Sequence, residues 1–196
     1  MESQTGSQKH HHMNIYFMRH GRTNYNDLSL CNDDPQQPVY LTPKGIEQAN
    51  SAARALRHVP FERIITSPLP RTRQTAEIVN YHHSVAIETH PDLADIRSGF
   101  DGKSVADYFA AIAGDPLHKR INGGESLLDH KQRVLRFIDW LNNQNDKTLL
   151  VVAHEETLRV FIAYFEGNIA DHQLRDIHIG NCEFRQYTLT RQPVST

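Results

Sequence analysis

The chain has 196 residues, and its 21 Lys plus Arg against 23 Asp plus Glu give a formal net charge of −2. This length favours a single domain, and so balanced a charge provides no electrostatic reason to bind nucleic acid or an anionic membrane. The longest uninterrupted apolar runs, Tyr108–Ala113 and Val160–Phe165, have six residues, far fewer than a membrane span needs. We find no pattern typical of a secretory signal, and Cys31 and Cys182 indicate neither a disulfide framework nor a zinc site. We therefore expect a cytoplasmic protein without nucleic-acid or membrane partners; composition does not predict its oligomeric state.

Residues 1–12 are polar, lack periodicity and end in a histidine triplet directly before Met13. This composition is more typical of an expression tag than of a metal-binding tail. We therefore expect an expression tag over residues 1–12 and a single domain over residues 13–196.

The first half of that domain alternates apolar strands with amphipathic helices. Residues 14–18 predict a strand that stops at Arg19-His20-Gly21. Residues 43–58 predict a helix that Thr42 caps. Its expected apolar face consists of Ile46, Ala49, Ala53 and Leu56. Ile64-Ile65 predicts a second strand, which ends at Ser67-Pro68, and residues 70–80 predict the next helix.

The second half continues the alternation. Residues 85–87 predict a short strand, and residues 104–113 a helix that Gly114-Asp115-Pro116 ends. A helix over 125–142 has an apolar face formed by Leu127, Val134, Ile138 and Leu141. Leu149–Ala153 is the clearest buried strand; a helix over 156–166 and a last strand over Phe184–Leu189 follow it. This order predicts a three-layer α/β sandwich with a mostly parallel sheet.

Three of the predicted strands end in residues that are capable of chemistry. Arg19-His20-Gly21 follows the first strand, Ser67 to Arg71 the second, and His154-Glu155 the strand Leu149–Ala153. Because functional loops of parallel sheets lie at the carboxyl ends of the strands, we expect these groups to converge at one edge.

Those residue types provide the parts of a metal-free phosphoryl transfer. An arginine guanidinium group can donate two parallel hydrogen bonds to phosphate oxygens, and a neutral imidazole nitrogen can attack phosphorus. Neighbouring arginines lower the pKa of such a histidine, because like charges disfavour its protonated form. A carboxylic acid is then needed to protonate the leaving oxygen.

Several ordered motifs resemble the histidine phosphatase, or phosphoglycerate mutase-like, superfamily. Arg19-His20-Gly21-Arg22-Thr23-x-x-Asn26 is similar to its R-H-G-x-[ST]-x-x-N signature. The other similar blocks follow in the family's order: Leu41-Thr42-x-x-Gly45, Thr66-Ser67-Pro68-Leu69-x-Arg71, Gly123-Gly124-Glu125-Ser126, Val151-Val152-Ala153-His154 and Asn181-Cys182. The resemblance covers about residues 13–190 and implies the superfamily's α/β fold.

The resemblance also implies residue roles. His20 matches the nucleophile that becomes phosphohistidine, and Arg19, Arg71 and His154 match the pocket that holds the phosphoryl group. Thr23 and Asn26 match additional substrate contacts.

Two carboxylates compete for the role of proton donor. Asp95 lies in the segment Leu93-Ala94-Asp95, which matches the family's L-x-E pattern except that aspartate replaces glutamate. Glu155 directly follows His154, where many members have glycine and the histidine acid phosphatases place their acid. We favour Asp95, because its segment matches in position and partial burial is enough to raise a carboxyl pKa. Asp101 is a further candidate.

The short distance in sequence between Arg71 and His154, 83 positions, favours a phosphatase. It leaves little room for the insertion that encloses substrate in phosphoglycerate mutases, so water is expected to reach the phosphohistidine. We therefore expect a phosphatase acting on a small phosphorylated metabolite without a metal or cofactor. The alternatives are a phosphoglycerate mutase, a protein phosphohistidine phosphatase and, in a different class, a catalytically weak module that binds a phosphorylated ligand or a protein.

Overall fold

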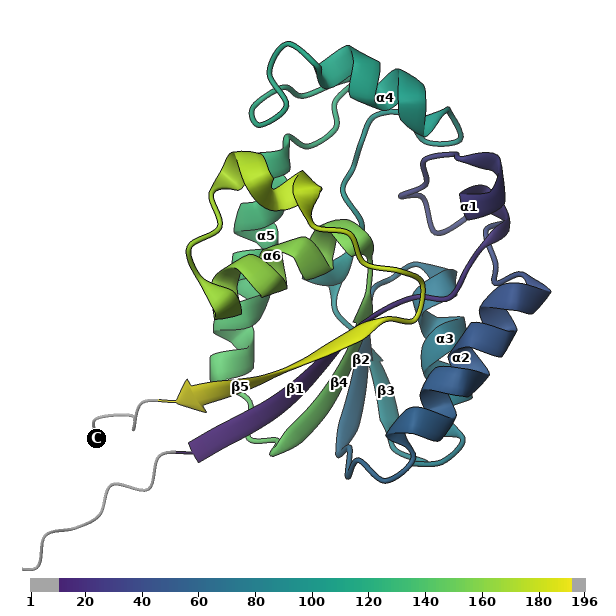
Figure 1. Cartoon of the computed structure of the whole chain (residues 1–196), viewed down its shortest axis with the longest axis vertical. Helices are drawn as coiled ribbons and strands as arrows, with labels where there is room; N and C mark the ends of the chain where they lie inside the picture. The colour runs from purple at the N-terminus through teal and green to yellow at the C-terminus, as the bar shows by residue number, and fades with distance from the viewer. Residues whose placement is uncertain (1–10, 192–196) are drawn as a thin grey trace, which may run out of the picture.

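A five-stranded sheet in the order β3-β2-β4-β1-β5 forms the centre of the computed structural model, which describes residues 11–191 (Figure 1). The strands are β1 (His11–Arg19), β2 (Arg63–Thr66), β3 (Ala86–Thr89), β4 (Thr148–Ala153) and β5 (Phe184–Arg191). Strands β1 to β4 pair in parallel, whereas β5 pairs antiparallel with β1 at one edge. The predicted α/β class with a mostly parallel sheet is therefore confirmed.

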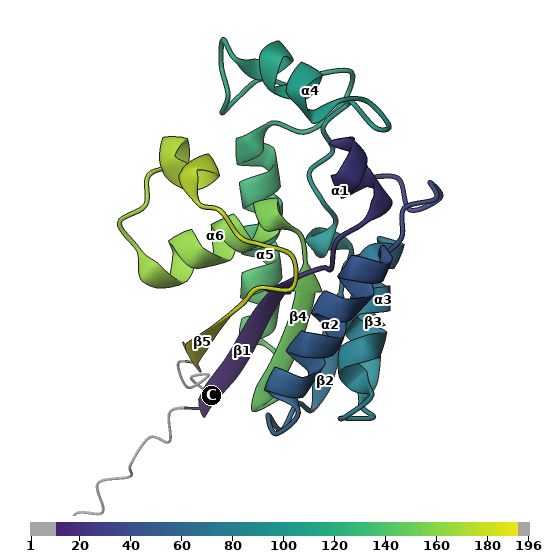
Figure 2. The same cartoon turned by 45° about the vertical axis from the view of Figure 1, so that its right-hand side comes forward.

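Helices cover both faces of this sheet (Figure 2). One face carries α2 (Pro43–Leu56) and α3 (Pro70–Asn80), and the other carries α5 (Leu127–Asn142) and α6 (Glu155–Glu166). The short helices α1 (Asn24–Leu28) and α4 (Val105–Ile112) lie beyond the carboxyl ends of the strands (Figure 1). Two 3₁₀ segments, η1 (Pro91–Leu93) and η2 (Asp171–Asp176), complete the described chain.

Strand β4 shows why the sheet needs both layers of helices. All six of its residues are buried. Because successive side chains of a strand point to opposite faces, Leu149, Val151 and Ala153 join the apolar cluster beneath α5 and α6. Leu150 and Val152 join the cluster beneath α2 and α3. A strand buried on both sides reads as a continuous apolar run, as this one does.

The predicted start of α2 is confirmed, but its predicted apolar face is partly wrong. The Thr42 hydroxyl accepts a hydrogen bond from the Gly45 amide at 3.1 Å, as an N-cap residue does. Ile46 is 44% exposed. The buried face consists of Gly45, Ala49, Ala52, Ala53 and Leu56. Small residues form this face because α2 packs closely: a Cβ at position 45 would lie 2.1 Å from the Arg22 carbonyl oxygen.

The first strand begins earlier than the expected residues 14–18. Strand β1 begins at His11, and His12 pairs with Thr190 of β5, so two residues assigned to the expected tag extend the sheet. Residues 1–10 lie outside the described part, and the tag itself stays a prediction. Between residues 11 and 191, no helix combines the length and apolar character needed to cross a membrane.

Candidate active site

The carboxyl ends of three neighbouring strands bring the predicted groups together. In the sheet, β4 lies between β2 and β1. His20 follows β1, Ser67 follows β2, and His154 follows β4. Gly21 is required at this edge, because a Cβ there would lie 2.7 Å from the Gly45 carbonyl oxygen. The strand order thus places motifs that are distant in the sequence side by side in one site.

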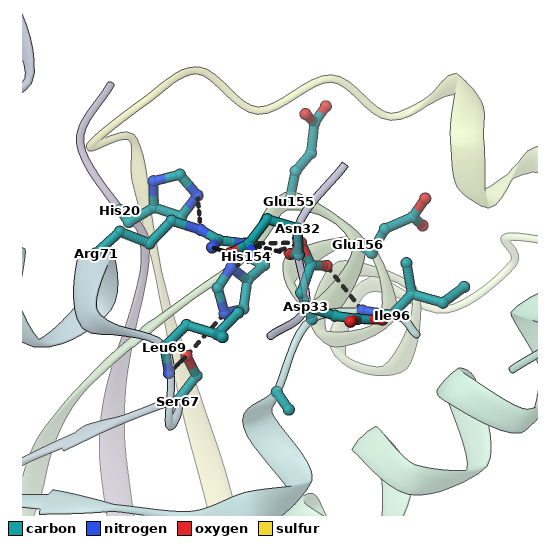
Figure 3. A network of polar contacts seen from close by, with 12 residues as sticks. His20, Asn32, Asp33, Ser67, Leu69, Arg71, Ile96, His154, Glu155 and Glu156 are labelled. Carbon is teal, nitrogen blue, oxygen red and sulfur yellow. Dashed lines mark hydrogen bonds and ion pairs between the residues drawn. The ribbon is translucent and has the colours of Figure 1, made fainter. Parts of the chain in front are cut away.

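His20 is buried and presents a neutral ring nitrogen. Its Nδ1 lies 2.7 Å from the Gly21 carbonyl oxygen, which only accepts, so Nδ1 carries the proton. Its Nε2 accepts a hydrogen bond from Arg71 Nε at 3.3 Å (Figure 3). Burial, and then the charges of Arg71 and Arg19, hold the pKa of His20 well below its ordinary value. Nε2 therefore has the lone pair that a nucleophile needs.

His154 lies at the N-cap of α6, and its ring is almost fully buried. Its Nε2 lies 2.8 Å from the Ser67 hydroxyl, which fixes the ring (Figure 3). Nδ1 makes no hydrogen bond within residues 11–191, and Asp95 Oδ2 lies 3.8 Å away. The centroids of the His20 and His154 rings are 5.4 Å apart. A buried ring nitrogen without a partner beside the nucleophile is suited to a phosphoryl oxygen.

Arg71 lies in the first turn of α3, and each of its three side-chain nitrogens donates a hydrogen bond. Besides Nε, which faces His20, Nη1 donates to Asn32 Oδ1 at 2.6 Å and Nη2 to the Asn32 carbonyl at 3.0 Å. Nη2 also lies 3.2 Å from Asp95 Oδ2. Asn32 is a site residue that the sequence did not indicate: it lies in an irregular loop, and none of the recognised motifs includes it.

Arg19 completes the cationic side of the site. Its Nη1 donates to the Ile179 carbonyl at 2.6 Å and lies 3.1 Å from Glu155 Oε2. Its buried Nε has no hydrogen-bond partner within the described chain. Asn181 holds the loop that follows β1, because its side-chain amide donates to the His20 carbonyl oxygen at 3.1 Å.

Thr23 and Asn26 line the same cavity but also form the capping box of α1. The backbone amide of Asn26 donates to Thr23 Oγ1 at 3.1 Å, and the backbone amide of Thr23 donates to Asn26 Oδ1 at 3.0 Å. These bonds satisfy free donors at the helix start. The cap explains both residue types structurally, and their contact with substrate stays a prediction.

Asp95 lies just after η1, with its carboxyl between Arg71 and His154. Oδ1 accepts a hydrogen bond from the Ile96 backbone amide at 2.8 Å. Burial raises the pKa of Asp95 and outweighs the opposing charge of Arg71, and the nearby Glu156 carboxylate raises it further. A carboxyl with a raised pKa beside the nucleophile has the properties of a general acid.

Glu155, the other predicted acid, is engaged by two arginines. Oε2 pairs with Arg19, and Oε1 accepts from Arg159 Nη2 at 2.8 Å. Oε1 also accepts from the Ile179 amide at 3.4 Å. Figure 3 shows Glu155 and Glu156 on the side of the site away from Ser67. The third carboxylate, Asp101, accepts from Asn32 and the Asp33 amide at 3.1 and 2.7 Å, and so anchors the loop that holds Arg71.

These groups line a cavity with a volume of about 220 Å³. Its polar part contains every predicted catalytic or binding residue: Arg19, His20, Thr23, Asn26, Arg71, Asp95, His154 and Glu155. Its apolar part is formed by α1, α4 and adjoining segments, through Tyr25, Leu30, Val39, Val105, Tyr108 and Phe109. The cavity thus combines an anion site with a wall suited to an apolar organic group.

Comparison with known proteins defines the class. The model of the histidine phosphatase superfamily (branch 1) matches residues 15–194, so the chain belongs to this superfamily. The predicted family and the predicted enzyme class, a phosphatase, are confirmed.

Particular relatives extend this result. The adenosylcobalamin/alpha-ribazole phosphatase of Salmonella typhimurium is 33% identical over 161 residues, covering 77% of this chain and 78% of that one. The probable phosphoglycerate mutase GpmB of Erwinia tasmaniensis is 26% identical over 190 residues, covering 92% and 87%. A putative alpha-ribazole-5'-P phosphatase of Escherichia coli superposes with a TM-score of 0.81 at 26% identity, over 91% of this chain and 94% of that one.

Proposed function

We propose that this chain hydrolyses a small phosphomonoester through a phosphohistidine on His20. The observation that carries the proposal is the neutral Nε2 of His20, which lies in one cavity with Arg19, Arg71 and the unpartnered Nδ1 of His154. The arginines bind and neutralise the phosphoryl oxygens, which favours attack by a neutral nucleophile.

The reaction has two steps. In the first, His20 Nε2 forms a bond to phosphorus, the ester P–O bond breaks, and the carboxylic acid of Asp95 gives its proton to the leaving oxygen. In the second, water attacks phosphorus, the P–N bond breaks, and the Asp95 carboxylate takes the proton of that water. Inorganic phosphate then leaves, and His20 and Asp95 return to their starting states.

The first substrate to test is alpha-ribazole phosphate. Relatives that carry this activity in their names are 33% and 26% identical to the chain. The apolar wall with Tyr25, Tyr108 and Phe109 suits an aromatic base, because such surfaces bury flat apolar groups. Phosphate release from this compound, compared with a panel of sugar phosphates and nucleotides, tests the assignment; a preference for another class would replace it.

We expect activity to be independent of metal ions. Arg19 and Arg71 supply the positive charge that a divalent cation would bring to a phosphoryl group. Dialysis against EDTA followed by a p-nitrophenyl phosphate assay should leave turnover unchanged. Loss of activity that one divalent ion restores would contradict this expectation.

The pH profile should have its maximum on the acidic side of neutrality. The nucleophile must be unprotonated, and the lowered pKa of His20 keeps it so in mild acid. The acid must be protonated, and the raised pKa of Asp95 extends its protonated form toward neutral pH. Activity on an alkyl phosphate should therefore decline as pH rises through the pKa of Asp95. Asp95→Asn should remove this alkaline decline, and a decline that survives the substitution would assign it to another group.

A further inference from the structure

The charged residues that line the cavity compensate one another. Among the described lining residues, the cations are Arg19, Arg71 and Arg159 and the carboxylates are Asp95, Glu155 and Glu156. Arg71 pairs with Asp95 at 3.2 Å. With neutral histidines, three positive charges thus face the carboxylates of Glu155 and Glu156 and the titratable carboxyl of Asp95, so little positive charge remains for an anion beyond the dedicated phosphoryl donors.

Glu155 is the centre of this compensation. Its carboxylate lies between Arg19 Nη1, at 3.1 Å, and Arg159 Nη2, at 2.8 Å. Arg159 Nη1 also lies 3.3 Å from Glu156, and its Nε donates to the Ile177 carbonyl at 2.7 Å. Every nitrogen of Arg159 therefore has a partner, and the positive charge of this guanidinium is directed at the carboxylates of Glu155 and Glu156.

The adjoining cation, Arg175 on η2, is directed at Glu156 and the aromatic residues of α4, and within residues 11–191 its buried Nη1 has no hydrogen-bond partner. Its Nε donates to Glu156 at 2.9 Å, and its Nη2 donates to the Tyr108 hydroxyl at 2.9 Å. Its guanidinium carbon lies 5.4 Å from the ring centroid of Tyr108 and 5.1 Å from that of Phe109. Cation–π contacts of this kind hold the aromatic wall of α4 in place. Arg175 thus supports an apolar surface.

Donors for the phosphoryl group itself remain available. Arg19 Nε and His154 Nδ1 are buried and make no hydrogen bond within residues 11–191. A phosphomonoester therefore finds partners for its phosphoryl oxygens, but a second anionic group finds only paired arginines and the carboxylates of Glu155 and Glu156.

We propose that Glu155 is a specificity-determining residue: by pairing with Arg19 and Arg159, it selects phosphomonoesters whose organic part is uncharged and excludes those with a second anionic group. The proposal rests on the proposed function, and it gives a role to the carboxylate that stands where many superfamily members have glycine. Repulsion between like charges at a binding surface is a common means of rejecting wrong ligands.

Glycerol 3-phosphate and 3-phosphoglycerate test the proposal directly, because they differ only in a hydroxymethyl group against a carboxylate. Their dissociation constants are measured by calorimetry in a His20→Ala background, where neither compound is turned over. We expect glycerol 3-phosphate to bind about tenfold more tightly or better. Adding Glu155→Gln should bring the two constants close together, mainly by tightening 3-phosphoglycerate, and Glu155→Asp should keep the discrimination.

Glu166→Gln is the matched control. It makes the same charge change at the other end of α6, where the carboxylate accepts from the Tyr187 hydroxyl at 2.6 Å. The ratio of dissociation constants should not change in this variant. A selectivity loss equal to that of Glu155→Gln would mean that the effect is not local to the cavity, and would overturn the proposal.

The remaining outcomes are also decisive. Equal or tighter binding of 3-phosphoglycerate without any change at Glu155 overturns the proposal, even if Glu155→Gln fails to fold. An unchanged ratio in a folded Glu155→Gln protein also overturns it. Discrimination without turnover by the unmodified chain would leave this proposal standing and refute the proposed hydrolysis. Binding of neither compound would overturn this proposal, and turnover of alpha-ribazole phosphate would decide separately on the proposed hydrolysis.

Discussion

His20→Ala should abolish phosphatase activity, with a loss on the order of 10⁴-fold or more, because the nucleophile is removed. His20 Nε2 is the neutral, hydrogen-bonded nitrogen that faces Arg71, and no other group in the proposed reaction replaces it. The measurement is phosphate release from p-nitrophenyl phosphate. In parallel, the unmodified protein quenched early with labelled substrate should carry acid-labile phosphate, and the variant should carry none.

Loss of folding has to be distinguished from loss of the nucleophile. The His20 side chain bonds only Gly21 and Arg71 among the described residues, so removing it leaves Arg71 Nε unsatisfied at a cost of about 1–3 kcal/mol. Thermal unfolding should therefore shift modestly while the circular dichroism spectrum is retained. His118→Ala, at an exposed position paired with Asp115, is the control and should keep full activity. Substantial turnover by folded His20→Ala would refute the proposed nucleophile.

The sequence predicted those elements of the fold in which buried apolar residues follow a recognisable pattern along the chain. Leu149–Ala153 is a continuous buried apolar run, the apolar face of α5 is periodic, and both were predicted correctly. Segments α1, η1 and η2 are short and have too little periodicity to indicate a helix. The antiparallel direction of β5 depends on pairing with β1 across most of the chain, which a local pattern does not encode.

Within the site, motif residues were predictable and their mutual contacts were not. His20, Arg71 and His154 belong to recognisable blocks, and parallel strands bring such blocks to one edge of the sheet. The bonds from Asn32 to Arg71 join residues 39 positions apart through an irregular loop. The pairing of Glu155 with Arg159 has ordinary helical spacing, but its pairing with Arg19 depends on how β1 and β4 align.

The role of Glu155 illustrates this difference. From its position after His154, the sequence made Glu155 a competitor of Asp95 for the role of proton donor. The structure places both of its oxygens against arginines, whereas Asp95 lies beside His154 Nδ1 at 3.8 Å. The contacts of the carboxylate oxygens thus favour Asp95 over Glu155 as the proton donor. Rate measurements on substrates with a good and a poor leaving group test this assignment.

Asp95→Asn should slow hydrolysis of an alkyl phosphate by about 10²–10⁴-fold and hydrolysis of p-nitrophenyl phosphate far less. An alkoxide is a poor leaving group and needs a proton in the transition state, whereas p-nitrophenolate leaves without one. The measurement is kcat for both substrates, with glycerol 3-phosphate as the alkyl ester. Asparagine keeps the size of the side chain but has one acceptor oxygen, so it can keep either the contact with Arg71 Nη2 or the bond from the Ile96 backbone amide.

Two further variants separate proton donation from effects on the shape of the site. Glu155→Gln should change kcat on both substrates mildly and to a similar extent, because Glu155 contacts Arg19 and Arg159 rather than a leaving oxygen. Asp101→Asn should also act equally on both, through the loop that positions Asn32. If sensitivity to the leaving group follows Glu155 instead, the acid is the carboxylate next to His154. If it follows Asp101, the loop carboxylate donates the proton, and the pairing of Asp95 with Arg71 serves only to position the guanidinium.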